Sequence, residues 1–269
     1  MLRSFKKLVS LVLVLALSLA VSLPAFAAKP TDSQTKDSGS YIIKDSGIEQ
    51  PIIDSKAQSS YYERYMAITP LGTSDTNIFN NVQGVVNRMG YSAQSFSLRP
   101  AIDIYNNLPY NHFTIIHGHG GPGSIECDHT SAGQSGAWSG LYAYPVTLSN
   151  SKDACMANYI SNALGRHKLI VFITCNGAQP KNGYSMASQS VNKGAACSIG
   201  FYNKLIYGGE WLQDFVGQLH NRYTVQNSIN KAKNIFNNKY PSILESSMCP
   251  TYSGNLHTFG KTSTIVRVN

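Results

Sequence analysis

Strand-like and helix-like patterns of apolar residues alternate along the chain from residue 61 onward. Short segments with apolar residues in runs or in alternation predict strands. They lie at residues 66–69, 91–96, 112–116, 169–173 and 195–201. The run at 169–173 is entirely apolar, which is typical of a strand buried on both faces of a sheet.

Between these segments, apolar residues recur every three or four positions, as they do on one face of a helix. This spacing predicts helices across residues 74–90, 97–108, 156–164, 186–194, 211–219 and 225–236. Ser74 or Asp75 would cap the first helix, which Gly90 would end. Ser97 would cap the second, and Pro109 would stop it.

The alternation of strands and helices determines the expected fold class. Residues 124–150 interrupt it with a loop-like stretch in which only hairpins are expected. The pattern predicts an α/β fold, a three-layer α/β/α sandwich with a mostly parallel central sheet. In sheets of this kind, ligands bind outside the carboxyl ends of the strands.

The first 60 residues do not follow this pattern. Residues 1–27 begin with basic residues, continue with about 16 apolar residues and end in Ala25-Phe26-Ala27, which is the layout of a cleavable signal peptide. The alternative, a retained anchor, is disfavoured because the apolar run is shorter than the roughly 20 residues that span a bilayer. We therefore expect a secreted or extracytoplasmic protein with no stable membrane span after cleavage. Residues 28–60 are polar and would form a flexible leader or a propeptide, and residues 61–269 would form the folded domain.

The net charge and the number of cysteines indicate which partners and which disulfides to expect. The 269 residues carry a net charge of +8, but three of the basic residues lie in the expected signal peptide and no Lys/Arg run follows it. A nucleic-acid partner is therefore not expected. The five cysteines make an odd number, so an exported chain would keep at least one unpaired thiol. The other four would allow two disulfides with three connectivities.

Two of the predicted strands run into reactive residues. The segment 113–116 is followed by His117-Gly118-His119-Gly120-Gly121, and the segment 169–174 is followed by Cys175. If these strands are parallel neighbours, a histidine and a cysteine emerge at the same edge of the sheet. A thiolate beside an imidazole can attack a carbonyl while the imidazole transfers the proton. The glycines would let backbone N–H groups approach a developing oxyanion.

An apolar strand ending in His-Gly, followed by an apolar strand ending in Cys, resembles the caspase-like cysteine peptidases. This group includes caspases, legumains, gingipains, clostripain, metacaspases and the CHAT domains. Residues 184–201 and 210–236 are also similar to the helix, strand and two helices that follow the cysteine in CHAT-type domains. The resemblance covers roughly residues 61–236 and implies a caspase-like fold and a cysteine endopeptidase that cleaves a protein or peptide substrate without a cofactor.

The resemblance also assigns roles to individual residues. Cys175 would be the nucleophile and His119 the general acid and base, since His119 begins a legumain-like His-Gly-x-x-Gly stretch; His117, also followed by glycine, is the alternative base. Gly120 would donate to the oxyanion together with the Cys175 N–H. Asp128 is a candidate specificity residue, because an acidic pocket would favour basic substrates. Metacaspases have an acidic residue just before the cysteine, whereas here Thr174 stands there.

Three other interpretations stay open. His117 and His119 would be metal ligands only with further ligands, for which no spacing pattern is present, so no metal is expected. The stretch His119–Gly123 also resembles the oxyanion loop of α/β-hydrolase serine peptidases, which would need Ser135 or Ser185 as nucleophile in an incomplete Gly-x-Ser-x-Gly elbow. Finally, a caspase-like domain without turnover would serve as a binding or scaffold domain.

Overall fold

The structure, a computed structural model, describes residues 64–69, 76–97, 99–127 and 139–268. The expected signal peptide and leader, and the caps Ser74 and Asp75, lie outside these residues. Within them, no helix is both long enough and apolar enough to cross a bilayer.

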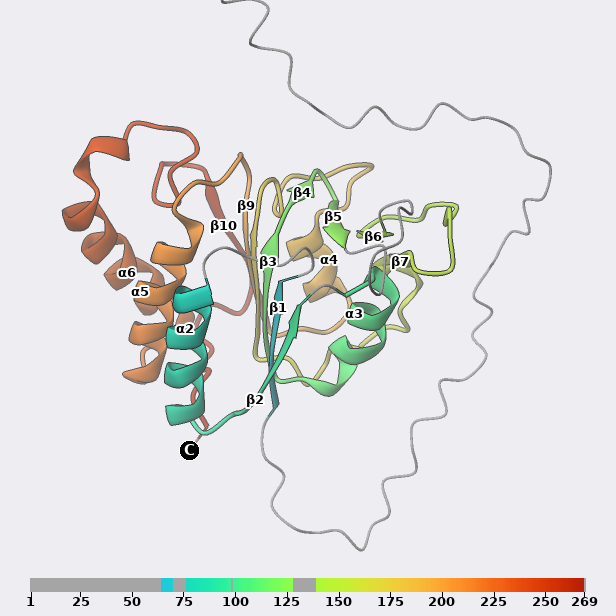
Figure 1. The fold of residues 1–269 in the computed structure, drawn as a ribbon, viewed down its shortest axis with the longest axis horizontal. Coiled ribbons are helices and arrows are strands. Elements are labelled where there is room, and N and C mark those ends of the chain that lie inside the picture. The colour runs from blue at the N-terminus through green and yellow to red at the C-terminus, as the bar shows by residue number, and fades with distance from the viewer. Residues whose placement is uncertain (1–63, 70–75, 98, 128–138, 269) are drawn as a thin grey trace, which may run out of the picture. The chain divides into compact units, whose positions relative to one another are not determined.

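A six-stranded sheet forms the centre of the described fold, with the strand order β10-β9-β8-β3-β1-β2 (Figure 1). Every neighbouring pair is parallel except β9 and β10, which are antiparallel. The strands are β1 (Arg64–Thr69), β2 (Ser92–Ser97), β3 (Phe113–Gly118), β8 (Leu169–Thr174), β9 (Cys197–Phe201) and β10 (Leu256–Gly260). The predicted α/β class with a mostly parallel sheet is confirmed.

Helices lie beside both faces of this sheet. Figure 1 shows α2, α5 and α6 on one side of the strands and α3 and α4 on the other. Their bounds are α2 (Thr76–Arg88), α3 (Ala101–Asn107), α4 (Met186–Asn192), α5 (Gly208–His220) and α6 (Val225–Lys239). Short 3-10 helices cover Leu108–Tyr110, Met156–Asn158 and Pro241–Ile243.

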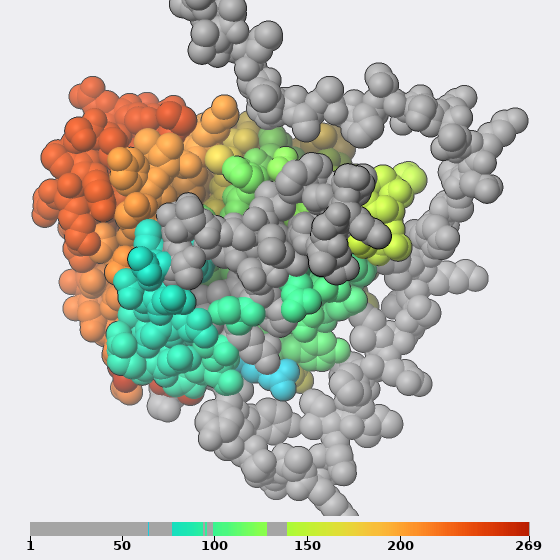
Figure 2. All heavy atoms as spheres, viewed as in Figure 1, coloured from blue at the N-terminus to red at the C-terminus, as the bar shows by residue number. Residues whose placement is uncertain are grey.

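Successive side chains of β8 enter two separate hydrophobic clusters, because strand residues alternate between faces. Leu169, Val171 and Ile173 join the cluster that contains Trp211 and Phe215 of α5, together with residues of α2 and α6. Residues 170 and 172 join the second cluster, which includes residues of α3 and α4. Figure 2 shows the surface of α2 lying against that of α5 and α6. The fully apolar run of β8 therefore follows from burial on both faces.

A second sheet lies between β3 and β8 in the sequence. Its strand order is β4-β5-β6-β7, with β4 (Gly120–Gly121), β5 (Ser124–Cys127), β6 (Ser139–Tyr142) and β7 (Ala154–Cys155). The antiparallel pair β5–β6 accounts for the hairpin expected in this stretch. The buried carboxylate of Asp153 holds the region together by accepting hydrogen bonds from the N–H groups of Gly140 (2.7 Å) and Ser149 (3.0 Å).

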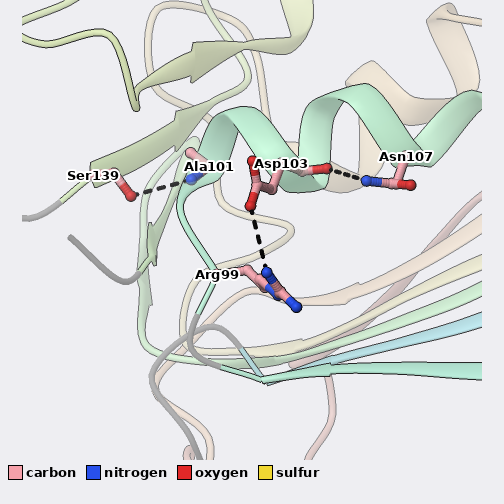
Figure 3. A network of polar contacts seen from close by, with 5 residues as sticks. All are labelled: Arg99, Ala101, Asp103, Asn107 and Ser139. Carbon is pink, nitrogen blue, oxygen red and sulfur yellow. Dashed lines mark hydrogen bonds and ion pairs between the residues drawn. The ribbon is translucent and has the colours of Figure 1, made fainter. Parts of the chain in front are cut away.

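One hydrogen bond attaches α3 to this second sheet, and another closes within the helix. The Ala101 N–H donates to Ser139 Oγ of β6 at 3.1 Å, and Asn107 Nδ2 donates to the Asp103 carbonyl at 2.8 Å (Figure 3). Arg99 lies 3.9 Å from the Asp103 carboxylate. The predicted cap at Ser97 is wrong: that residue ends β2, and the helix begins only after Pro100 in an extended conformation. The predicted stop before Pro109 is confirmed.

One further prediction needs correction, and one strand was not predicted. Residues 156–164 form a 3-10 helix followed by turns, not an α-helix. Met156, Tyr159 and Leu164 are buried all the same, whereas Ile160 is exposed. The Tyr159 ring stacks on Tyr105 with centroids 3.8 Å apart, and Asn162 adopts a left-handed φ of 67° that an α-helix excludes. The edge strand β10 was not predicted from the sequence.

Candidate active site

The register of β3 and β8 defines the candidate site. These strands are parallel neighbours, with His117 opposite Ile173 and Gly118 opposite Thr174. His119 is the residue after β3, and Cys175 is the residue after β8. Both therefore follow at the same level at the carboxyl edge of the sheet. The parallel pairing that the sequence argument required is therefore present.

The Cys175 thiol is free and half-buried, and the chain segment after β9 holds it in place. Cys175 Sγ accepts a hydrogen bond from the Leu205 N–H at 3.3 Å. The next residue, Asn176, has a left-handed φ of 57° and donates its N–H to the Asn203 carbonyl at 3.0 Å. These two backbone contacts fix the sulfur and the turn that follows it against the segment after β9.

The other four cysteines differ from Cys175 in burial. All five thiols are free, so the two disulfides that the sequence allowed are not formed. Cys127, Cys155, Cys197 and Cys249 are each at most 1% exposed. Burial raises the pKa of the Cys155 thiol, and it raises that of Cys197 to about 11. Cys175 is thus the one thiol of the chain with appreciable access to solvent.

The two histidines that precede the glycines lie in different surroundings. His119 is exposed, and its backbone carbonyl accepts a hydrogen bond from the Glu126 N–H at 3.1 Å. His117 is half-buried, with its ring centroid 4.9 Å from that of Phe79 in α2. His119 is therefore a solvent-accessible residue that follows β3 where Cys175 follows β8, whereas His117 lies two residues earlier and packs on Phe79.

The glycine segment packs directly on the strand end that carries Cys175. A Cβ placed on Gly120 would lie 2.8 Å from the Cys175 carbonyl oxygen, so position 120 has no room for a side chain. The segment is held further along by Gly123, whose N–H donates to the Gln179 carbonyl and whose carbonyl accepts from the Ala143 N–H. This packing places the backbone of Gly120 next to the Cys175 peptide, where the sequence argument expected an oxyanion donor.

The remaining candidate residues lie elsewhere or have other roles. Asp128 and Ser135 lie outside the described residues. Ser185 is buried and caps α4, where its hydroxyl accepts the Ser188 N–H at 3.0 Å. It follows an isolated bridge at Tyr184, not a strand of either sheet. Within the described ranges, no three His, Cys, Asp or Glu side chains are grouped so that they could hold a metal ion.

Sequence reasoning did not identify Leu205 as part of the site. Its contribution is a backbone N–H, which any residue except proline supplies, so no residue type at this position could have indicated it. Only the position of the segment after β9, next to the carboxyl end of β8, brings this group to the sulfur.

Comparison with known proteins adds no assignment. The chain matches no protein-family model, and no curated protein is significantly similar to it in sequence.

Proposed function

We propose that this protein is a secreted cysteine endopeptidase that hydrolyses peptide bonds with a Cys175/His119 dyad. The observation that carries the proposal is the register of β3 and β8, which brings an exposed imidazole and the only solvent-accessible thiol to one level at the carboxyl edge of a parallel sheet. Attack by a thiolate needs a group that takes the proton of the thiol and returns it to the leaving amine. His119 would perform both transfers, and His117 is the alternative base.

The proposal assigns the oxyanion of the tetrahedral intermediate to the backbone at Gly120 and Cys175. Two N–H groups that point to the same position stabilise an oxyanion far better than water does, because they need no reorientation when the charge develops. The close approach of Gly120 to the Cys175 carbonyl supports this assignment. The Leu205 N–H would hold the sulfur in position before attack.

The proposed fold is a three-layer α/β/α sandwich of the caspase-like type. Two hydrophobic clusters, one for each set of alternating β8 side chains, support three layers. The antiparallel edge strand, and the extra sheet between the histidine-bearing and cysteine-bearing strands, are compatible with the family resemblance. Secretion rests on the signal-peptide pattern of residues 1–27 alone.

Cleavage of a mixed peptide library by wild type and by Cys175→Ala tests the proposal. We expect cleavage by the wild type and a loss of at least about a thousandfold in kcat/KM for the variant, since removal of a nucleophile abolishes the covalent route. Cys197→Ala is the matched control: it removes a buried thiol at the opposite end of a neighbouring strand and should keep its activity.

Three outcomes would contradict the proposal in different ways. Equal cleavage by wild type and Cys175→Ala would exclude the thiol mechanism. Inhibition by a fluorophosphonate with resistance to iodoacetamide would favour the serine peptidase. Absence of cleavage, with retained binding of peptides by both proteins, would favour the scaffold domain.

A further inference from the structure

The side chain of Thr174, the last residue of β8, is buried without an evident structural purpose. Its exposed fraction is 1%. Its hydroxyl has no hydrogen-bond partner among the residues that the structure describes. Buried hydroxyls are almost always paired, and an unpaired one lowers the stability of the fold.

The fold alone does not require a hydroxyl at this position. The residues two and four positions earlier on the same face of β8 are Phe172 and Ile170, both part of an apolar cluster. Valine has nearly the shape of threonine and would fill the position without a buried polar atom. The hydroxyl at residue 174 is therefore unfavourable for the stability of the fold, and such unfavourable features occur most often at functional sites.

The surroundings of Thr174 connect it to the proposed reaction. Its Cβ lies 3.0 Å from where a Cβ on Gly120 would stand, and its Oγ1 lies 2.7 Å from the same point on Gly177. The side chain is thus enclosed by the glycine segment that follows His119 and by the turn that follows Cys175. Both backbones carry groups that must be oriented for chemistry at Cys175, and neither leaves room for a larger side chain.

We infer that Thr174 is a positioning residue of the proposed peptidase, so the inference rests on the proposed function. As the substrate carbonyl becomes tetrahedral, the Thr174 hydroxyl, whose oxygen lies on the Gly177 side, donates a hydrogen bond to the backbone of the turn after Cys175 and fixes the Cys175 N–H toward the developing oxyanion. The bond forms in the reacting complex and not in the free protein, as catalytic hydrogen bonds often do. The unpaired hydroxyl slightly lowers the stability of the free protein and makes the reaction faster.

Two buried threonines allow a matched test of this inference. Thr114 on the neighbouring strand β3 faces the same side of the sheet and is 0% exposed, but its hydroxyl is 3.0 Å from His167 Nε2. It lies near the amino end of β3, remote from Cys175. Thr114→Val removes a hydroxyl that has a hydrogen-bond partner in the free protein, whereas Thr174→Val removes one that has none among the described residues.

The experiment measures kcat, KM and the thermal midpoint of Thr174→Val, Thr174→Ser and Thr114→Val. For Thr174→Val we expect a thermal midpoint equal to or above that of the wild type and a kcat about tenfold lower, equivalent to about 1.4 kcal/mol. KM should change less than twofold, because the lost bond acts on the transition state. Thr174→Ser should recover most of the rate. Thr114→Val should show the opposite pattern, a lower midpoint and a kcat like that of the wild type.

The other outcomes overturn the inference. If Thr174→Val keeps the wild-type kcat, the hydroxyl does not act in the reaction. If it lowers the midpoint as Thr114→Val does, the hydroxyl has a structural partner in the free protein. Failure of the proposed function is recognised separately, because the wild type would then not cleave the peptides or Cys175→Ala would still cleave them.

Discussion

Acid should destabilise this protein through one buried histidine, His167. The side chain is 1% exposed, and its Nε2 is 3.0 Å from Thr114 Oγ1. The pKa of this imidazole is lowered to about 3, mainly by burial and also by the nearby His112, while a backbone interaction with Leu164 acts in the opposite direction. His167 is therefore neutral in the folded protein at any moderate pH.

The size of the effect follows from the difference between the folded and unfolded pKa. In the unfolded chain the pKa of a histidine is about 6.5, so below that pH the unfolded state gains a proton that the folded state cannot accept. The stability that His167 contributes is complete above pH 6.5 and is lost as the pH falls toward 3. The loss is about 1.4 kcal/mol per pH unit, hence about 2 kcal/mol at pH 5. For a domain of this size, that lowers the thermal midpoint by about 4–8 °C.

Urea or thermal unfolding between pH 7.5 and 4.5 measures this dependence for wild type and His167→Gln. Glutamine places an amide near the position of Nε2 and does not titrate, so the variant should lose the His167 part of the slope while the carboxylate part remains. His257→Gln, at the half-buried edge strand β10, is the control for removal of a histidine as such. Parallel stability curves for wild type and His167→Gln between pH 6.5 and 5 would refute the reasoning.

Three further predictions concern the candidate site. Brief treatment of the native protein with iodoacetamide should modify Cys175 alone, and denaturation should expose all five thiols; modification of a second cysteine in the native protein, seen by mass spectrometry, would contradict the burial pattern. Gly120→Ala should lower kcat at least about a hundredfold, as loss of an oxyanion donor does, because its Cβ would displace the backbone from Cys175. Gly121→Ala meets only Ser124 Oγ at 3.4 Å, so its thermal midpoint should match that of the wild type. His119→Ala should lower kcat about a hundredfold or more without loss of stability, whereas His117→Ala should lower the thermal midpoint through its contact with Phe79; the reverse pattern would identify His117 as the base.

The elements that were predicted correctly are those whose local pattern and tertiary burial agree. The apolar run of β8 indicated burial on both faces, and the spacing of α5 and α6 placed their apolar residues on one side. Strand β10 was missed because it is an edge strand: its side chains are only partly buried, so Leu256 to Gly260 lacks a strong apolar pattern. Its position depends on pairing with β9, which local sequence does not encode.

The error at residues 156–164 has a different origin. The helical spacing indicated correctly that Met156, Tyr159 and Leu164 are buried, but Ile160 of the same pattern is exposed, and burial does not require a helix. The left-handed conformation of Asn162 prevents a continuous helix, and the Tyr159 ring reaches Tyr105 from a non-helical segment. Periodicity over nine residues is too short a signal to separate these cases.

For the candidate site, the sequence predicted which strand ends carry reactive residues but not what surrounds them. The strand order of the central sheet shows which strand ends lie beside one another. The chain passes from β1 to β2 on one side of β1 and then crosses to β3 on the other side. The strand order therefore reverses between β1 and β3, and ligands bind at such a reversal point in sheets of this kind. Cys175 follows the next strand, β8, so β3 borders both the reversal point and the strand that leads to the thiol. The histidine-bearing strand thus lies between the reversal point and the strand that leads to Cys175, which gives the proposed Cys175/His119 pairing a topological argument that is independent of any motif.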